Sequence, residues 1–557
     1  MLKKNEIIDI TITSATAEGN GVGHTDEGIA VFVPLSAIGD KLSVKILKVK
    51  KTYAFAKIEK ILEPSESRIV PDCPYFEKCG GCVWRHINYD EECKIKQQRV
   101  VDAVERIGGI HTDFKPIIRC NNTLRYRNKA QFPIGKDRDG NIQIGFYAFH
   151  SHRIIDCDDC LLQPEVFSKV MNITRKFIAE TNADIYDERT GKGRLRHLYI
   201  RLGELTDELM VCYVVNGNGL KQEDLLIKML REELPNLKTV VFNSNRENTN
   251  VILGQKNRIA YGNGYITDRL CGLNFKISPF SFWQVNRSQA EKLYSKAKEY
   301  ANLKSDEILL DLYCGTGTIG LTMAKDCKTL VGVEIVEDAV KDANVNAKLN
   351  GIDNAKFICS DAASAVKTLQ AEGLSPDVVI LDPPRKGCGE ELSETVSKMQ
   401  PKRIVYVSCD PATLARDLKY FGERGYVTKE ITPCDMFSRT AHVETVVLLS
   451  HKKPDGHINV KVEFGEGDGK VPLDNIAKRA ESYKPKERVT YKMIKEYIEA
   501  KYGFKVHTAY IAEVKRDLGL PMYDAPNAVE ELKQPRKHPT PEKVEAIKDA
   551  LKHFEVI

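Results

Sequence analysis

The first 60 residues alternate apolar and polar side chains, and glycines interrupt the alternation. Three alternating stretches run from Ile8 to Ile12, from Ile29 to Val33 and from Leu42 to Ile46, and the breaks fall at Gly19, Gly21, Gly23 and Gly39. A period of two with glycine breaks predicts short strands that close into a small antiparallel barrel. Several lysines around Tyr53 are typical of an RNA-binding barrel and, equally, of a solvated lysine edge.

The pattern changes beyond the barrel. Residues 63–275 alternate strand-like runs with helical stretches and predict a mixed α+β central region. From about residue 285 to 450, helical segments and glycine loops separate short apolar runs, which are Ile308–Leu312, Leu330–Val333, Lys356–Ile358, Val378–Leu381 and Arg403–Val407. Repeated units of this kind predict a doubly wound parallel sheet of the α/β class.

The last hundred residues differ again. Residues 451–486 are rich in Gly, Pro, Lys, Asp and Glu and are interpreted as a linker. The extension 487–557 contains two helical periods on either side of Gly503, which resemble a helix-turn-helix. A helical packing module without nucleic-acid contacts is the alternative, because basic residues such as Lys515 and Arg516 are interspersed with acids.

Composition narrows the class of protein without identifying it. The chain has 557 residues, of which 42% are hydrophobic and 29% charged, as in ordinary folded proteins. Its net charge of +5 means that an RNA-binding surface would be a local basic patch. No apolar run approaches the ~20 residues of a membrane span, and the N-terminus lacks the apolar core of a signal peptide. We expect a cytoplasmic protein without a membrane partner, whose 15 cysteines are reduced thiols, metal ligands or nucleophiles.

A nucleoside cofactor is indicated by the segment from Ile308 to Gly320, which joins a buried strand, a glycine loop and the start of a helix. Glycines let the backbone approach a ligand, and such loops lie where parallel sheets bind ligands. Glu334 ends the next strand, where it can accept hydrogen bonds from a ribose diol. Asp382 ends a further strand and precedes two prolines, which turn the chain out of the sheet. This combination favours S-adenosylmethionine over a nicotinamide cofactor.

Cys409 and Glu444 are the candidate catalytic residues. Cys409 follows a buried strand and precedes a helix. Because a helix N-terminus stabilises a thiolate, the position predicts a nucleophile with a lowered pKa. Glu444 opens the last strand and is the candidate base.

Further cysteines have the spacing of a metal site. Cys73, Cys79 and Cys82 lie close together in the sequence, and Cys157 and Cys160 follow later. Four thiolates serve a tetrahedral zinc ion as well as an iron–sulfur cluster, so the chemistry of the residues alone leaves both open.

Together, these motifs resemble the bacterial 5-methyluridine RNA methyltransferases, from residue 1 to about 450. The resemblance implies an OB-like TRAM barrel over 1–62, a central domain with the cluster cysteines over 63–275 and a Rossmann-like methyltransferase domain over 276–450. The linker 451–486 and the helical extension 487–557 lie outside the family pattern.

The resemblance also implies a role for each candidate residue. Cys409 would add to C6 of uracil, so that C5 can attack the methyl group of S-adenosylmethionine, and Glu444 would then remove the C5 proton. Phe282 would line the pocket of a flipped uridine. A [4Fe-4S] cluster would be bound by Cys73, Cys79, Cys82 and Cys160, with Cys157 as a competitor for the fourth position. The cofactor would be contacted by Gln284, Tyr313, Thr318, Glu334, Asp361 and Asp382. Ser438, where the family usually has proline, leaves the catalytic residues intact.

The substrate is the main open point. Related enzymes modify large-subunit ribosomal RNA or the T-loop of tRNA, and the cluster cysteines with a TRAM barrel favour 23S rRNA, modified by a monomeric enzyme. One alternative is an RNA-binding module that has lost its chemistry, against which Cys409, Glu444 and the glycine loop argue. The other is a nicotinamide-dependent iron–sulfur oxidoreductase.

Overall fold

The computed structural model describes residues 2–452, 491–518 and 538–554. The chain divides into two compact units, Met1–His457 and Ile458–Ile557. Within the described ranges, no helix has both the length and the apolar character that crossing a membrane requires.

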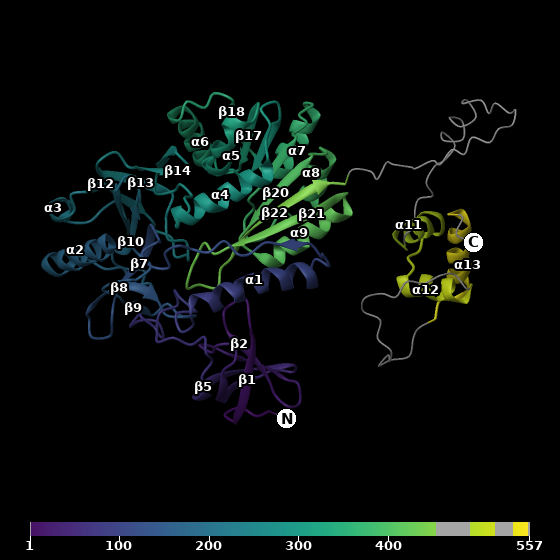
Figure 1. Cartoon of the computed structure of the whole chain (residues 1–557), viewed down its shortest axis with the longest axis horizontal. Coiled ribbons are helices and arrows are strands. Elements are labelled where there is room, and N and C mark those ends of the chain that lie inside the picture. Colours follow the sequence, from purple (N-terminus) through teal and green to yellow (C-terminus); the bar gives the residue numbers. More distant parts are fainter. Residues whose placement is uncertain (1, 453–490, 519–537, 555–557) are drawn as a thin grey trace, which may run out of the picture. The chain divides into compact units, whose positions relative to one another are not determined.

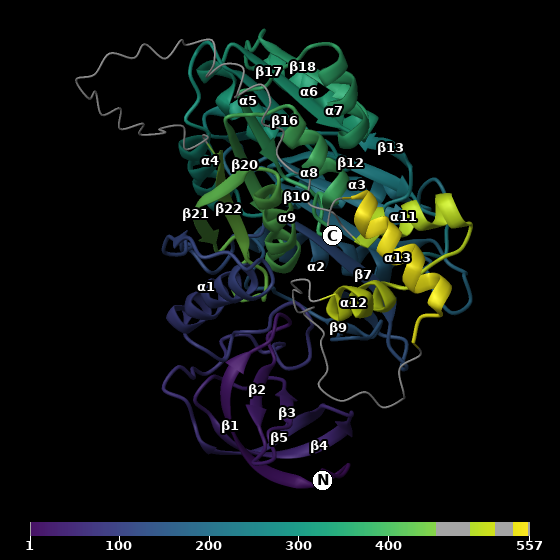
Figure 2. The same ribbon diagram turned by 90° about the vertical axis from the view of Figure 1, so that its right-hand side faces the viewer.

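The first unit begins with a closed five-stranded barrel, which confirms the fold predicted from the alternating pattern (Figure 2). Its strand order is β1-β2-β3-β5-β4, and alternate side chains such as Ile12, Val31 and Val44 fill the interior. The strands are β1 (Ile7–Ala15), β2 (Gly21–His24), β3 (Ala30–Val33), β4 (Lys41–Val49) and β5 (Tyr53–Glu63).

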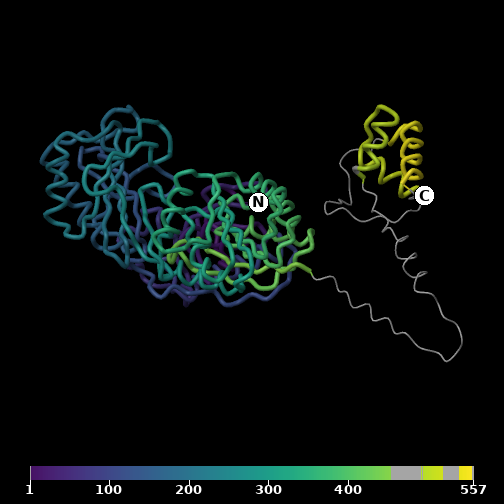
Figure 3. The backbone as a smooth tube through the Cα atoms, turned by 90° about the horizontal axis from the view of Figure 1, so that it is seen from above, coloured from purple at the N-terminus to yellow at the C-terminus, as the bar shows by residue number. Residues whose placement is uncertain are grey.

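The central region is built on a seven-stranded sheet of order β13-β12-β11-β10-β7-β8-β9. Helices α2 (Glu165–Thr181) and α3 (Glu223–Glu233) pack together against it and share its hydrophobic core. Figure 3 shows this sheet as one lobe beside the lobe of the C-terminal sheet. The strands are β7 (Lys129–Lys136), β8 (Ile142–Tyr147), β9 (Ile154–Asp156), β10 (Leu195–Leu202), β11 (Leu209–Val215), β12 (Leu237–Ser244) and β13 (Lys256–Tyr261).

The predicted doubly wound sheet follows, after the hairpin β14 (Ile266–Leu270) and β15 (Leu273–Ile277). It has eight strands in the order β18-β17-β16-β19-β20-β22-β21-β6, of which β22 runs antiparallel to both of its neighbours. Its strands are β16 (Ile308–Leu312), β17 (Thr329–Glu334), β18 (Ala355–Cys359), β19 (Val378–Leu381), β20 (Arg403–Ser408), β21 (Tyr426–Cys434), β22 (Glu444–His451) and β6 (Asp113–Phe114).

Helices cover both faces of this sheet (Figure 1). One face packs against α4 (Arg287–Ala301), α5 (Thr318–Met323) and α6 (Glu337–Leu349). The other packs against α1 (Tyr89–Arg106), α7 (Ala362–Ala371), α8 (Gly389–Lys398) and α9 (Pro411–Glu423). Helix α1 and strand β6 belong by sequence to the central region, yet both are part of the C-terminal sheet and its helical cover. Strand β6 extends the sheet edge beside β21, and α1 packs against α9 and β21.

The second unit is helical, as the sequence predicts. Helices α11 (Tyr491–Tyr502) and α12 (Thr508–Asp517) lie at the two predicted helical periods, and α13 (Pro541–His553) packs against both. Ile498, Ile511 and Ile547 are fully buried in their shared core. The helix-turn-helix interpretation stays a prediction, and the interpreted linker lies almost wholly outside the described residues.

Candidate active site

One cavity of about 820 Å³ lies at the carboxyl ends of β16, β17 and β19. Polar side chains from these strand ends and the adjoining loops line it, because the carboxyl ends of parallel strands meet at one edge of the sheet. Five of the six residues predicted to contact the cofactor lie on its wall: Gln284, Tyr313, Glu334, Asp361 and Asp382.

The sixth, Thr318, is buried behind this wall. It begins α5, and its hydroxyl lies 3.2 Å from the hydroxyl of Tyr294. The structure therefore places Thr318 next to the cavity but not among the residues that line it.

Glu334 is held rigidly at the end of β17. One carboxylate oxygen accepts a hydrogen bond from the backbone N–H of Gly315 at 3.1 Å, and the other accepts one from Val336 at 2.9 Å. Each oxygen keeps a free lone pair for a further donor. The carboxylate is thus oriented to accept hydrogen bonds from hydroxyl groups in the cavity.

The glycine loop is fixed to the strand that precedes it. The buried carboxyl group of Asp311 accepts a hydrogen bond from the backbone of Gly320 at 2.9 Å, and burial raises the pKa of Asp311 to about 8. A Cβ atom on Gly320 would lie only 2.6 Å from that carboxyl oxygen, so glycine is required here.

Asp382 and Asp361 differ in their surroundings. Burial raises the pKa of Asp382 to about 7, because the charged form is less well hydrated there than in water. Asp361 is exposed and caps α7 by accepting a hydrogen bond from the backbone of Ser364 at 3.0 Å, which lowers its pKa. The sequence interpretation did not anticipate this capping role.

A second cavity of about 810 Å³ meets the first at Cys409. Four residues line both cavities: Arg127, Arg385, Cys409 and His442. Glu444 and Phe282 line the first cavity and not the second, and the Phe282 residue is 62% exposed. A ring entering between the two cavities would meet the thiol and the carboxyl group together.

The predicted lowered pKa of Cys409 is wrong for this structure. Burial, the charge of Glu444 and the charge of Asp382 raise the pKa of the thiol to about 11, and only Arg385 among nearby side chains opposes them. The helix N-terminus gives little help because Asp410 caps α9, accepting hydrogen bonds from the backbone of Ala412 at 3.0 Å and Thr413 at 2.9 Å. The N–H groups that were expected to stabilise the thiolate are already satisfied by a carboxylate.

Glu444 is the first residue of β22 and is 6% exposed. Burial, followed by the charge of Asp382, raises its pKa to about 8, and Arg385 acts in the opposite direction. The carboxyl group is therefore mostly protonated at neutral pH, and a modest change in its surroundings would ionise it.

The loop before Glu444 is anchored by a buried ion network. Lys96 of α1 donates to Glu92 at 2.7 Å, to Asp435 at 2.6 Å and to the backbone carbonyl of Phe437 at 3.1 Å. Ser438, the departure from the family pattern, donates to Asp435 at 2.6 Å. These contacts fix the loop that carries Phe437 and His442 to the first cavity.

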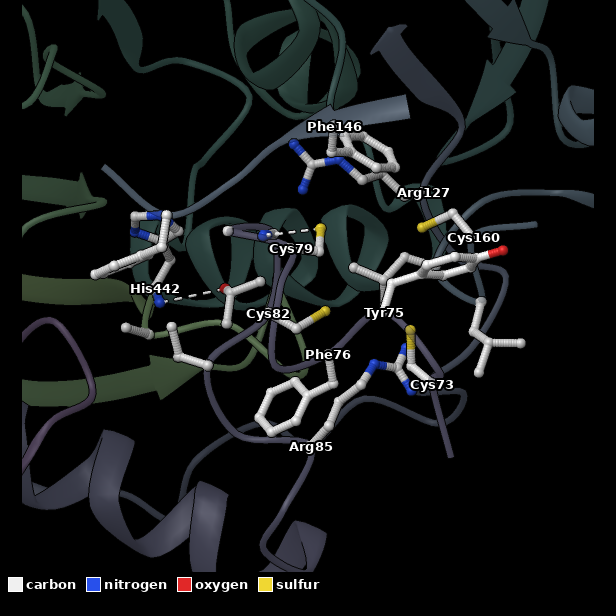
Figure 4. A pocket seen from close by; sticks show the side chains of 18 of the residues that line it. Cys73, Tyr75, Phe76, Cys79, Cys82, Arg85, Arg127, Phe146, Cys160 and His442 are labelled. Atoms are coloured by element: carbon white, nitrogen blue, oxygen red, sulfur yellow. Dashed lines mark hydrogen bonds between the residues drawn. The ribbon is translucent and has the colours of Figure 1, made fainter. Parts of the chain in front are cut away.

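The predicted cluster cysteines lie together on the wall of the second cavity. In Figure 4 the sulfur atoms of Cys73, Cys79, Cys82 and Cys160 are directed toward a common space, with His442 farther along the cavity. Burial raises the pKa of Cys79 and of Cys82, and burial together with the charges of the other three thiols raises the pKa of Cys160 to about 12. Cys157 lines the same wall.

The arrangement of these thiols bears on which metal group they could hold. Among the described residues, no three His, Cys, Asp or Glu side chains converge tightly enough for a single metal ion. A zinc ion needs every sulfur within about 2.3 Å of one point, whereas a four-iron cluster offers each thiolate its own iron.

Sequence reasoning assigned no role to the cationic and imidazole side chains that line the cavities, among them Arg127, Lys129, Arg385 and His442. Arg385 and His442 stand close to Asp382 and Glu444 in the sequence, which is a signal that could have found them. Burial and four nearby cations lower the pKa of His442 to about 4, so its imidazole is neutral at physiological pH.

Comparisons with known proteins agree with this geometry. Residues 118–452 match the family model of tRNA (uracil-5-)-methyltransferases, and residues 2–58 match the TRAM domain. A Clostridium tetani protein described as an uncharacterized RNA methyltransferase is 43% identical over 450 residues, covering 81% of this chain and 97% of that protein. A similarly described Halalkalibacterium halodurans protein is 43% identical over 452 residues, covering 81% of this chain and 98% of that protein.

A solved structure has the same fold. The Pyrococcus abyssi tRNA (uracil-54, C5)-methyltransferase, in complex with S-adenosyl-L-homocysteine, superposes with a TM-score of 0.64 and 28% identity, covering 79% of this chain and 100% of that one. These matches remove the nicotinamide-dependent oxidoreductase alternative. The chain belongs to the S-adenosylmethionine-dependent RNA (uracil-5-)-methyltransferase family and carries an N-terminal TRAM domain.

Proposed function

We propose that this protein methylates C5 of a specific uridine in 23S rRNA, with Cys409 as the nucleophile and Glu444 as the base. The observation that carries the proposal is the position of Cys409 at the junction of two cavities, with Glu444 beside it. One cavity would hold the methyl donor and the other the RNA, so that the uracil ring lies between them.

The reaction begins with the addition of the Cys409 sulfur to C6 of uracil. The electron pair that moves to C5 then attacks the methyl group of S-adenosylmethionine, and S-adenosylhomocysteine leaves. Glu444 removes the remaining C5 proton, the C5–C6 double bond re-forms, and the bond between C6 and sulfur breaks. Because the thiol has a raised pKa, its proton must leave before or during the addition.

The residues of the first cavity would hold the cofactor. Glu334 would accept hydrogen bonds from the ribose diol, since both of its oxygens are already oriented by the backbone. Gln284, Tyr313, Asp361 and Asp382 would contact the remainder of the molecule. Support comes from the P. abyssi relative, which binds S-adenosyl-L-homocysteine.

Cys73, Cys79, Cys82 and Cys160 would bind a [4Fe-4S] cluster. Methylation of uracil needs no electron transfer, so the cluster would stabilise the loops that carry these cysteines. Bound iron would offset the burial and, after it, the charges of the other three thiols that raise the pKa of the Cys160 thiol. Arg85, which is buried and paired with Asp72 at 2.5 Å, lies where it can neutralise the Cys82 thiolate.

The second candidate substrate is the T-loop of tRNA. It is favoured by the P. abyssi relative, which is a tRNA (uracil-54, C5)-methyltransferase. The cysteine set of the second cavity and the TRAM barrel favour ribosomal RNA in our interpretation, and a monomer would be sufficient because the described residues of one chain line both cavities.

The test is methyl transfer from labelled S-adenosylmethionine by anaerobically purified protein, with unmodified 23S rRNA and unmodified tRNA as separate substrates. We expect label at C5 of a uridine in 23S rRNA. Label in tRNA alone would show that the substrate is a tRNA, and would favour the T-loop uridine over 23S rRNA. Absence of transfer to both, despite retained RNA binding, would favour the alternative of an RNA-binding module without chemistry.

A further inference from the structure

We propose that Arg127, Lys129 and Arg385 form a phosphate-binding wall that holds the RNA backbone next to the reacting uridine. All three lie on the second cavity, the one that runs from Cys409 to the cluster cysteines. The proposal rests on the proposed function, because it assumes that this cavity receives RNA.

In the part of the chain that the structure describes, none of the three side chains makes a hydrogen bond or an ion pair. The charge of Arg385 acts on Cys409 and Glu444 from a longer distance. Arg127 and Lys129 are half-buried, and half-buried cations are ordinarily paired, since an unpaired charge is costly to remove from water. Two such cations without a partner, with the exposed Arg385 on the same cavity wall, therefore indicate an anionic ligand.

The acids of the same cavity are engaged elsewhere. Glu18 and Asp410 are its acidic lining residues, and both act electrostatically on Arg99. Asp410 also caps α9. Glu444 faces Arg385 from the first cavity, but its raised pKa leaves it mostly uncharged at neutral pH.

The cluster thiols do not account for these cations either. Arg85 is the cation that lowers the pKa of Cys79 and Cys82 against the effect of burial. Neither Arg127 nor Lys129 is among the main groups that shift the pKa values of these cluster thiols. Figure 4 shows Arg127 on a different side of the cavity from Arg85.

Lys129 shows the excess of positive charge most clearly. It pairs in register with Arg201 on the neighbouring strand, and the buried Arg201 donates to the carbonyl of Ser281 at 2.7 Å while two of its nitrogens have no partner. Burial, Arg201 and Arg127 together lower the pKa of Lys129 to about 8. A phosphate group at this wall would relieve that repulsion. RNA supplies phosphates at the spacing of its backbone on both sides of a flipped base.

A substitution of Lys129 can distinguish RNA binding from S-adenosylmethionine binding in an experiment. Arg127 and Arg385 line both cavities, whereas Lys129 lines only the second. A change at Lys129 should therefore weaken RNA binding without changing the affinity for S-adenosylmethionine.

The experiment compares Lys129→Met with wild type in binding an unmodified 23S rRNA fragment over a range of salt concentrations. We expect the affinity for RNA to fall about tenfold, and the slope of log affinity against log salt to become shallower by about 0.7. The KM for S-adenosylmethionine and the iron content should stay unchanged. Lys129→Arg should restore both the affinity and the slope, because it keeps the charge.

The control is Lys169→Met, which removes an exposed lysine of α2 away from both cavities and should leave the salt slope unaltered. Thermal unfolding of each variant shows whether the fold is intact. If Lys129→Met binds RNA with wild-type affinity and salt slope, or loses iron while RNA binding is kept, the proposal of a phosphate-binding wall is wrong. If wild type binds RNA through Lys129 but transfers no methyl group, the proposed function fails and the phosphate wall stands.

Discussion

The two cavities that meet at Cys409 differ in the charged side chains that line them. The first has five acidic side chains, Glu334, Asp361, Asp382, Glu391 and Glu444, beside the three cations Arg127, Arg385 and Lys386. Cations predominate on the second: Arg85, Arg99, Arg127, Lys129 and Arg385, against Glu18 and Asp410. The first matches a small cofactor with a cationic sulfonium and a ribose diol, and the second matches a polyanion.

This difference explains the state of the thiol between them. Burial and the charges of Glu444 and Asp382 raise the pKa of the Cys409 thiol to about 11. The charge of Arg385, which lines both cavities, acts in the opposite direction but is outweighed. The thiol is therefore mostly protonated at neutral pH, and its proton must leave before the sulfur can act as a nucleophile.

The largest expected effect on methyl transfer is that of removing the nucleophile Cys409, which lines both cavities. Cys409→Ala should lower methyl transfer to the level of a reaction without enzyme, because C5 of uracil is then never activated. Binding of S-adenosylmethionine and of RNA should persist, measured by equilibrium titration. Cys359→Ala, which removes an exposed cysteine outside both cavities, is the matched control. Transfer by Cys409→Ala would remove this residue from the mechanism.

Removing the candidate base Glu444 should cause a smaller loss of methyl-transfer activity. Glu444→Gln should slow turnover by about 10²- to 10⁴-fold, since the C5 proton loses its acceptor. Methylated RNA should then accumulate as a covalent adduct with the protein, visible on a denaturing gel. Normal turnover without an adduct would show that another group removes the proton.

Removing one contact of the cofactor cavity should have a more moderate effect. Glu334→Ala should raise the KM for S-adenosylmethionine by about 10- to 100-fold, because two hydrogen bonds to a carboxylate are lost, and leave the KM for RNA unchanged. Glu337→Ala, on the exposed start of α6, serves as the control. A shift in the KM for RNA would contradict the separation of the two cavities.

The smallest effect is on stability. The folded-state pKa of Glu444 is about 8, above its ordinary value, so the folded protein binds the proton more tightly than the unfolded chain does. Its stabilising contribution is complete below about pH 4.5 and is lost as the pH rises through about 8. Glu444→Gln should therefore raise the free energy of unfolding at pH 9 by up to a few kcal/mol relative to wild type, and should have little effect at pH 5. Chemical unfolding at the two pH values measures this, and an equal effect at both would contradict the raised pKa.

The sequence predicted those features that depend on local pattern. The repeated apolar runs predicted the parallel sheet, and the strand ends predicted Glu334 and Asp382, because such ends share one edge. The pKa of Cys409 could not be predicted in the same way, since it depends on Asp382 and Glu444 from distant segments. The joining of β6 to the far edge of the sheet is likewise a long-range pairing with no local signal.

Half-buried cations escaped prediction for a related reason. Arg127 and Lys129 alternate with Tyr126, Asn128 and Ala130, as on a strand whose charged face is exposed. Only the folded structure shows that both side chains face a cavity with cluster cysteines and Cys409 on its wall.

The most direct test of the central claim is to trap the bond between RNA and protein. The protein is incubated with S-adenosylmethionine and a 23S rRNA fragment containing 5-fluorouridine, in which fluorine cannot leave C5 as a proton does. Peptide mass spectrometry should then find a methylated fluorouridine attached to Cys409, and no adduct in Cys409→Ala. An adduct on another residue, or methylation of ordinary uridine without any covalent adduct to fluorouridine, would contradict the account.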